Sequence, residues 1–425
     1  MPKHKQSFVN LRVDPDEQIR IGEATFAFVG HEITRQVYCQ AGARGWIYKL
    51  REVASGDHYA LKVFAHLFRG DGILHVQAAL GDVAALPGMD ACQRVLVAAE
   101  THPVLIIDYP AADRSMLMPW VEGTTWQDIV VLGEEAQEDG VDAPLTLESC
   151  QTLALDVAHM LAEIERHGYA HCDVAGANLI IQLKRKMTYL VDVEEMFGNG
   201  FPVPAQYPAG QTGYRHRSVP TTPTGQWSPS GDRYAGAVLL GEILCWHDPK
   251  IRKVRDQISF FEEDDSKKPE AWRKEEMEKS LEMHYPPKLT KLFRAAWRSD
   301  SLEGCPSMAD WEAAIKGAVA PGLYPPRLQE NPPPEAPDFE PLPPDATTLG
   351  AAREPDDFRR IYGIGGREVA VLHALGIATF ADLASAQPGD LEAQLQRAGI
   401  VVDGGEVGAW IADAAALAQE PLSKG

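Results

Sequence analysis

The sequence lacks the features that would place the chain in a membrane or in an oxidising compartment. No run of about 18 consecutive apolar residues occurs, so no transmembrane helix is predicted. The opening residues, MPKHKQSFVN, contain no long apolar stretch, and we expect no signal peptide. Only six cysteines are present, scattered, without a CxxC pair or zinc-site spacing. These absences favour a reduced, cytoplasmic protein.

Positive charge is also scarce. The 425 residues include 40 lysines and arginines against 61 aspartates and glutamates, a formal net charge of -21. This excess argues against non-specific binding to nucleic acid or to a membrane surface. The apolar content of 45% is ordinary for a globular protein, so a sizeable core is expected.

One segment differs sharply in composition from the rest of the chain. Ten of the 25 residues in 321–345 are proline, which disfavours a helix and favours an extended, semi-rigid chain. We therefore predict a linker at 321–345, a large domain over 20–320 and a small domain over 346–425.

The large domain is predicted to begin with strands and continue with helices. β-Branched and aromatic residues predict strands at 33–38, 46–53 and 59–64. Apolar residues at helical spacing predict helices at 153–164 and 234–246. The highly charged segment 262–282 is expected to form a solvated helix or loop face.

The segment HGYAHCDVAGANLII, residues 167–181, contains the pattern H-x-D-x-x-x-x-N, formed by His171, Asp173 and Asn178. A second strand-like segment, YLVDVE, then places Asp192 at its end. Phosphoryl transfer requires a carboxylate near the acceptor hydroxyl, and carboxylate and amide oxygens for Mg²⁺. These residues in this order predict that chemistry; the alternative is a hairpin with incidental polar residues.

Two features nearer the N-terminus fit the same chemistry. Gly42 and Gly45 lie in a segment where glycine would let the backbone approach phosphate oxygens, although an ordinary hairpin turn is the alternative. Lys62 lies inside the apolar strand YALKV, where an unpaired ammonium is costly to bury. Its position after the glycine segment favours phosphate binding over an edge-strand lysine that reaches solvent.

Together these motifs resemble the protein-kinase superfamily over roughly residues 20–320. The resemblance implies an α+β, two-lobed fold, with a β-rich N-lobe over about 20–121 and a helical C-lobe over about 122–320. It implies that ATP is bound by Gly42, Gly45, Ile47, Ala60, Lys62, Met118, Pro119, Trp120 and Val121. It further implies that the catalytic residues are Asp173, Lys62, Asn178 and Asp192, with Mg²⁺ or Mn²⁺ held by Asn178 and Asp192. Structural or regulatory roles are implied for His171, Asp232, Asp82, Thr212 and Tyr214.

The sequence also departs from the family pattern. Cys172 replaces the arginine of H-R-D, which argues against control by activation-loop phosphorylation. Ala175 replaces the catalytic-loop lysine, and Glu194 stands where glycine is usual. The expected helix over 73–86 offers only Gln77 or Asp82 as the acidic or polar partner of Lys62, and we favour Asp82. The primary hypothesis is a serine/threonine protein kinase; a nucleotide-binding pseudokinase scaffold and a small-molecule phosphotransferase are the alternatives.

The C-terminal 80 residues are predicted to be all helical. The segment FRRIYGIGGREVAVL, residues 358–372, resembles the helix-hairpin-helix family, in which a Gly-Ile-Gly turn lets two helices cross. Such turns often grip DNA phosphate, but residues 346–425 carry six Lys/Arg against eleven Asp/Glu, which favours protein docking. Weak DNA contact through 363–367 and Arg359/Arg360 is the alternative. A kinase-like domain joined to such a module resembles the kinase of bacterial phosphorylation triads, which implies a PP2C-type phosphatase and a von Willebrand A-type protein as partners.

Overall fold

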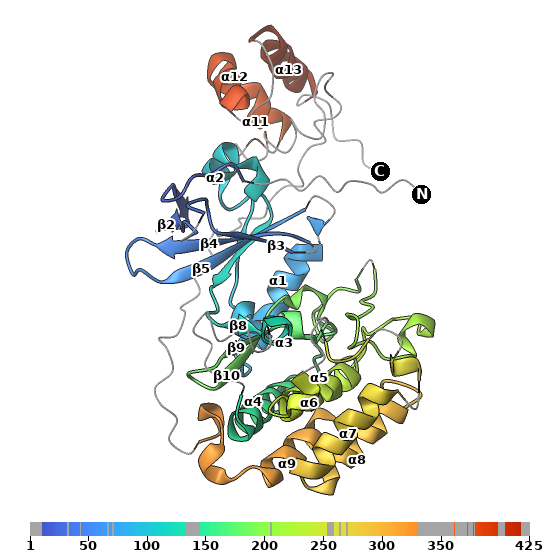
Figure 1. The fold of residues 1–425 in the computed structure, drawn as a ribbon. Coiled ribbons are helices and arrows are strands. Elements are labelled where there is room, and N and C mark those ends of the chain that lie inside the picture. Colours follow the sequence, from blue (N-terminus) through green and yellow to red (C-terminus); the bar gives the residue numbers. More distant parts are fainter. Residues whose placement is uncertain are drawn as a thin grey trace. The chain divides into compact units, whose positions relative to one another are not determined.

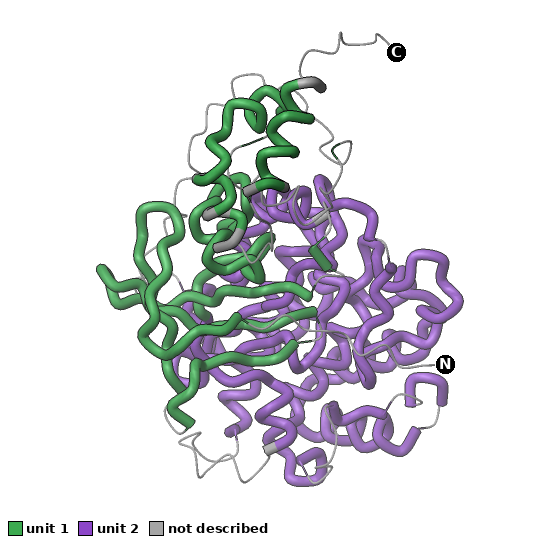
Figure 2. The backbone as a smooth tube through the Cα atoms, turned by 90° about the horizontal axis from the view of Figure 1, so that it is seen from above, with its two compact units in different colours: residues 1–70, 94–120, 340–425 green, residues 71–93, 121–339 purple. Residues whose placement is uncertain are grey.

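The computed structural model divides the chain into two compact units, shown in separate colours in Figure 2. Unit 1 comprises residues 1–70, 94–120 and 340–425, and unit 2 comprises residues 71–93 and 121–339. The structure describes residues 11–31, 34–42, 44–65, 68–69, 72–132, 145–204, 206–252, 259–262, 265–268, 271–329, 361, 372, 377, 379–397 and 404–417. The fold class is α+β, as the sequence predicts.

Unit 1 contains an antiparallel sheet of seven strands, several of which are labelled in Figure 1. The order is β1-β2-β4-β5-β7-β6, and β3 pairs with β4 outside this path. The strands are β1 (Gln18–Ile21), β2 (Ala24–Phe28), β3 (Cys39–Gly42), β4 (Gly45–Glu52), β5 (His58–Phe64), β6 (Val95–Val97) and β7 (Ser115–Pro119). Between β6 and β7 the chain forms α2 (Pro103–Asp108) and the short 3₁₀ helix η3 (Pro110–Ala112).

Two of the three predicted strands are confirmed. β4 and β5 each begin one residue earlier than the sequence suggests, and β4 also ends one residue earlier. The strand prediction over 33–38 is wrong for the described residues 34–38. Arg35 has a positive φ of 59°, and a single bridge joins Val37 to Gly30, so the chain turns here. The strand begins at Cys39 instead, because that residue opens the antiparallel register with β4.

Unit 2 is mainly helical, with a small antiparallel sheet of order β10-β9-β8. The helices are α1 (Gly72–Val83), α3 (Trp126–Leu132), α4 (Leu147–Arg166), α5 (Arg233–Cys245), α6 (Pro249–Arg252), α7 (Trp272–His284), α8 (Pro287–Arg298) and α9 (Met308–Ala318). The strands are β8 (Thr124–Thr125), β9 (Leu179–Gln182) and β10 (Met187–Leu190). The two predicted helices are confirmed as α4 and α5.

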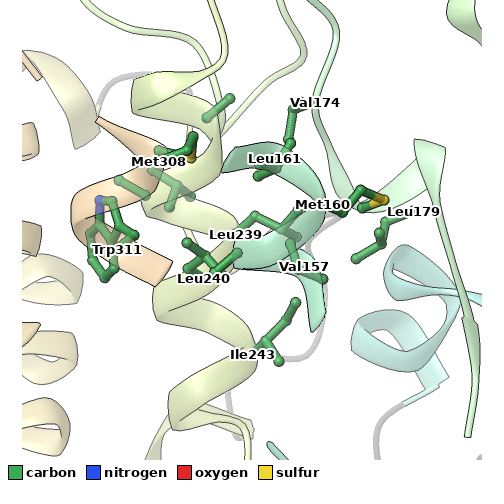
Figure 3. Packing of buried hydrophobic residues seen from close by; sticks show 14 of the residues in the cluster. Val157, Met160, Leu161, Val174, Leu179, Leu239, Leu240, Ile243, Met308 and Trp311 are labelled. Carbon is green, nitrogen blue, oxygen red and sulfur yellow. The ribbon is translucent and has the colours of Figure 1, made fainter. Parts of the chain in front are cut away.

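The core of unit 2 is built around α4 and α5. Every residue of α5 from Tyr234 to Cys245 is buried, the behaviour expected of a helix that is covered on all sides. In Figure 3 the side chains of α4 and α5 meet those of Met308 and Trp311, which come from α9. The loop that follows α4 and leads to β9 therefore begins at a helix that is closely packed in the core.

The charged segment 262–282 is not simply a solvated face, which corrects the prediction. Arg273, Lys274 and Glu278 on α7 are buried, as is Asp265 just before that helix. Arg273 forms ion pairs with Asp265 and Glu262, and the carboxylate of Glu278 accepts a hydrogen bond from Arg294 of α8. These charges can be buried because each has a partner of opposite sign.

The first residues of the predicted linker pack onto unit 2. The short 3₁₀ helices η9 (Pro321–Leu323) and η10 (Pro326–Leu328) follow α9. The Leu323 carbonyl accepts a hydrogen bond from Thr152 of α4, and Arg327 forms an ion pair with Asp156 of the same helix. The segment up to Gln329 therefore makes specific side-chain contacts with the helical unit.

The C-terminal residues form α11 (Phe380–Ser385), α12 (Pro388–Arg397) and α13 (Gly404–Leu417). Their side chains share a small apolar cluster that includes Phe380, Leu395 and Trp410. Thr379 and Asp382 form a capping box at the start of α11. The predicted turn at 363–367 and Arg359/Arg360 lie outside the described residues. No helix in the described ranges is both long and apolar enough to cross a membrane.

Candidate active site

The polar residues predicted to carry chemistry in unit 2 lie together on the loop between α4 and β9. The Nδ2 atom of Asn178 donates hydrogen bonds to Asp173, to its backbone oxygen at 2.8 Å and to its Oδ2 at 2.9 Å. Both acceptors are oxygens without a proton to give, so the amide nitrogen of Asn178 must face Asp173. The carbonyl oxygen of this buried side chain then points away from Asp173 and is available as a ligand.

The strand pair that follows connects this loop to Asp192. The backbone nitrogen of Val191 donates to the backbone carbonyl of Asn178 at 3.0 Å, and His171 Nε2 donates to the backbone carbonyl of Val191 at 2.9 Å. The Asp173 nitrogen donates to His171 Nδ1 at 3.3 Å. These partners fix the Nε2–H tautomer of His171, because a carbonyl only accepts and a backbone N–H only donates. His171 is thus a structural link that brings the residues around Asp173 and Asp192 together.

A buried carboxylate clamps the backbone of the same loop. Asp232, at the start of α5, accepts hydrogen bonds from the nitrogens of His171 at 2.6 Å and Cys172 at 2.7 Å. Cys172 has a positive φ of 63°, which is strained for a residue with a side chain. The two charge-assisted bonds offset that strain. Burial raises the pKa of Asp232, whereas the donated hydrogen bonds oppose the rise.

The two acidic side chains of the site interact electrostatically. The pKa of Asp173 is raised chiefly by burial, and the negative charge of Asp192 adds to the rise. Asp192 also has a positive φ, 65°, at the entry to the short 3₁₀ helix η6 (Val193–Glu195). A divalent cation at the carboxylate of Asp192 and the carbonyl oxygen of Asn178 would relieve the repulsion, and these hard oxygen donors suit Mg²⁺.

Within the described residues, no group of three or more His, Cys, Asp or Glu side chains could hold a metal by itself. A cation bound at Asp192 would therefore need further ligands besides such side chains. That is the usual situation of Mg²⁺, which is commonly held by one or two carboxylates together with waters and phosphate oxygens of a substrate.

Sequence reasoning missed Gln211, which also contacts the predicted catalytic carboxylate. Its Nε2 atom lies 3.4 Å from Oδ2 of Asp173 and donates to it. The contact spans 38 positions in the chain, so no local pattern could indicate it.

Glu242, in the middle of α5, was missed as well. Its Oε2 accepts hydrogen bonds from the Tyr214 hydroxyl at 2.6 Å and the Trp126 indole at 3.0 Å. Its Oε1 accepts from the Ser259 hydroxyl at 2.6 Å and the Phe260 nitrogen at 2.7 Å. Burial raises the pKa of Glu242, and these four donors oppose the rise. The sequence offered one indication of this network, because Glu242 is the one carboxylate in an otherwise apolar helix.

The network at Glu242 assigns a structural position to Tyr214. Its hydroxyl is buried against Glu242, and burial raises the pKa of Tyr214 well above its ordinary value.

Thr212, two residues before Tyr214 and also predicted to have a structural or regulatory role, is half-buried. Asp82, the favoured partner of Lys62, is exposed on α1.

Lys62 and the residues predicted to surround adenine belong to the sheet of unit 1. Lys62 lies in β5, opposite Ile47 of β4 and Met116 of β7, and only 4% of its surface is exposed. Its Nζ lies 5.4 Å from the centre of the Phe64 ring. Ala60 pairs with Met118 in the same register, and both are buried. A lysine buried this deeply requires a partner for its ammonium group, because an unpaired buried charge is costly.

The predicted nucleotide-binding residues that follow Met118 lie at and just after the end of β7. Pro119 ends β7, and the Trp120 nitrogen donates to the His58 carbonyl at 3.0 Å. The Nζ atom of Lys49 lies 4.6 Å from the Trp120 ring centre. Val121, the first residue of the next segment of unit 2, is half-buried.

The glycine segment forms a tight hairpin between β3 and β4, with Gly42 opposite Gly45. A Cβ at Gly45 would lie 2.0 Å from the Val63 carbonyl oxygen. The close packing against β5 is therefore sufficient by itself to require glycine at this position. A Cβ at Gly42 would meet only the Gly45 oxygen, at 3.7 Å. Ile47, on the following strand, is half-buried. The hairpin geometry therefore fits both the phosphate-binding prediction and the ordinary-turn alternative.

No protein-family model matches the chain, and a comparison with curated proteins gave no match. The resemblance to protein kinases therefore rests on the motifs and on the local geometry described above.

Proposed function

We propose that the chain is an ATP-dependent serine/threonine protein kinase with a two-lobed, protein-kinase-like fold over residues 20–320. The observation that carries the proposal is the pairing of Asp173 with Asn178. Both described bonds of the Asn178 amide nitrogen go to Asp173, which leaves the Asn178 carbonyl oxygen for a metal. One short loop thus supplies a carboxylate for the acceptor and an oxygen for the cation, as phosphoryl transfer requires.

In this proposal each residue of the site has a separate task. Asp173 orients the acceptor hydroxyl and receives its proton, whereas Asn178 and Asp192 hold Mg²⁺ or Mn²⁺. Bound ATP supplies the phosphoryl group. Lys62 would bind the phosphates, and the hairpin containing Gly42 and Gly45 would cover them. The role of Asp232 is to hold the loop that carries Asp173, since it binds two consecutive backbone amides of that loop.

The C-terminal helices would serve as a docking module in this proposal. The net acidity of residues 346–425 supports protein docking over DNA binding. A PP2C-type phosphatase and a von Willebrand A-type protein are the proposed partners, on the strength of the resemblance to bacterial phosphorylation triads alone.

The test is phosphate transfer by the purified chain. It is incubated with ATP and Mg²⁺ or Mn²⁺, alone and with casein as a generic protein acceptor, and added phosphate is located by mass spectrometry. Asp173→Ala and Asp192→Ala are expected to abolish transfer. Asp300→Ala is the matched control, because its side chain is fully exposed and distant in sequence from the site.

The outcome also separates the two alternatives. ATP binding without transfer to protein or hydrolysis would refute the kinase proposal and favour a pseudokinase scaffold. Consumption of ATP that needs both aspartates but places no phosphate on protein would favour a small-molecule phosphotransferase.

A further inference from the structure

We infer that Gln211 is a positioning residue that, together with the side-chain amide of Asn178, fixes the carboxylate of Asp173. The inference rests on the proposed function, because it assigns Gln211 a part in orienting the carboxylate that receives the acceptor proton. It adds a residue that the motifs did not identify.

The first observation is that two amide groups converge on one oxygen of Asp173. Asn178 Nδ2 donates to Oδ2 at 2.9 Å, and Gln211 Nε2 donates to the same atom at 3.4 Å. Among the described residues, the other carboxylate oxygen, Oδ1, accepts no side-chain hydrogen bond. Two donors on Oδ2 restrict rotation of the carboxylate and leave Oδ1 to receive a proton from an acceptor hydroxyl.

The second observation is that the backbone beside Gln211 is held firmly. Gly210 has a φ of 72°, and a Cβ there would lie 1.8 Å from the side-chain oxygen of Gln226. Arg215 donates from Nε to the Ala209 carbonyl at 2.7 Å and from Nη2 to the Gly210 carbonyl at 3.0 Å. The backbone at Gly210 therefore has a defined conformation, and a residue with a side chain would not fit there.

The residues after Gln211 are fixed in the same way. Gly213 has a φ of 84°, and a Cβ there would lie 2.6 Å from both the Phe261 carbonyl oxygen and the Ser259 hydroxyl. The Tyr214 nitrogen donates to the Gln211 carbonyl at 3.1 Å, and the Tyr214 hydroxyl is anchored on Glu242. Gln211 is thus presented to Asp173 from a segment tied to the buried core, which is the property required of a group that positions another.

Two size-matched variants test this role. Gln211→Met keeps the length of the side chain but removes the donor, and we expect kcat to fall about tenfold because small misplacements of a catalytic group are costly. Gln211→Glu should be slower still, because a second carboxylate would repel that of Asp173. The KM for ATP and the thermal midpoint should stay at the wild-type values. Gln206→Met, an exposed position on the same segment, is the control.

The measurement is the steady-state rate of phosphate incorporation into casein, or into the chain itself if only autophosphorylation occurs. The expected order of kcat is wild type, then Met, then Glu. If wild type is active and Asp173→Ala is not, a Gln211→Met variant with at least half the wild-type kcat overturns this inference alone. A fall in kcat matched by a lower thermal midpoint would show a structural role and also overturn it. If wild type transfers no phosphate, both the inference and the proposed function fail.

Discussion

Replacement of Arg327 by methionine tests whether the segment after α9 is part of the helical unit. The Arg327 guanidinium donates from Nη1 to Asp156 Oδ2 at 2.8 Å and to the Thr188 carbonyl at 2.9 Å. The Asp156 side chain is fully buried, and that of Arg327 is 9% exposed. The guanidinium carbon also lies 4.9 Å from the centre of the Tyr189 ring. Arg327→Met would keep much of the packing and remove the charge.

The expected cost follows from the buried carboxylate that remains. Thr188 would still donate its nitrogen and hydroxyl to Asp156 Oδ2, but Oδ1 is buried without a hydrogen-bond partner among the described residues. Removing one partner of a buried ion pair costs about 3–5 kcal/mol. Because two donors persist, we expect a loss near the lower end, roughly 3 kcal/mol. For a unit of this size that lowers the thermal midpoint by about 6–12 °C.

The pH dependence has a definite sign. Burial raises the pKa of Asp156 above its ordinary value of 3.8, and Arg327 opposes the rise. Without Arg327 the folded-state pKa would rise further. A raised carboxyl pKa favours folding below the unfolded-state pKa, and this stabilisation is lost as the pH rises through the folded-state value. The deficit of Arg327→Met should therefore be largest at neutral pH and shrink as the pH falls toward 4.

The assay is thermal unfolding followed by circular dichroism, between about pH 4 and pH 8, the range over which a raised carboxyl pKa is felt. Lys316→Met is the matched control, since Lys316 is exposed although its Nζ lies 5.6 Å from the Tyr324 ring centre. Asp156→Asn combined with Arg327→Met should recover part of the loss, because the uncompensated charge is gone. A midpoint for Arg327→Met equal to that of Lys316→Met would refute the reasoning.

Three further changes test the support of the candidate site. Asp232→Asn replaces one acceptor oxygen by an N–H that faces a backbone N–H, and it should cost about 1–3 kcal/mol of stability by chemical denaturation. Tyr214→Phe removes one donor from the buried carboxylate of Glu242 and should cost about 1.5–3 kcal/mol in the same assay; an unchanged midpoint would show that the bond contributes nothing. Gly210→Ala combines a positive φ with a Cβ 1.8 Å from the Gln226 side-chain oxygen, and it should lower the thermal midpoint more than Ala at Gly317, where nothing lies within 4 Å.

Local patterns in the sequence predicted what depends on local structure. β-Branched and aromatic residues located β4 and β5. Helical spacing of apolar residues located α4 and α5. The spacing of Asp173 and Asn178 also predicted their proximity, since only a short loop and the 3₁₀ helix η5 (Gly176–Asn178) separate them.

Contacts between distant segments could not be predicted in this way. The run of charges over 262–282 reads as a solvated face until Arg273 is seen paired with Asp265 inside the unit. Gln211 and Arg327 each lie in segments without periodicity, and their partners are far away in the chain. A charge or amide in the sequence indicates that a partner is needed, but it does not indicate which one.

The distribution of cysteines has a practical consequence for spectroscopy. None of the six, all of which lie in the described ranges, forms a disulfide, and Cys39 alone among them is not buried. Cys39 lies on β3, opposite Tyr48 and just before the hairpin turn at Gly42. Burial raises the pKa of its thiol, so labelling would be slow near neutral pH. A fluorescent maleimide should nevertheless attach at this one position in the folded chain, without any engineered cysteine, and would allow the proposed nucleotide binding to be tested.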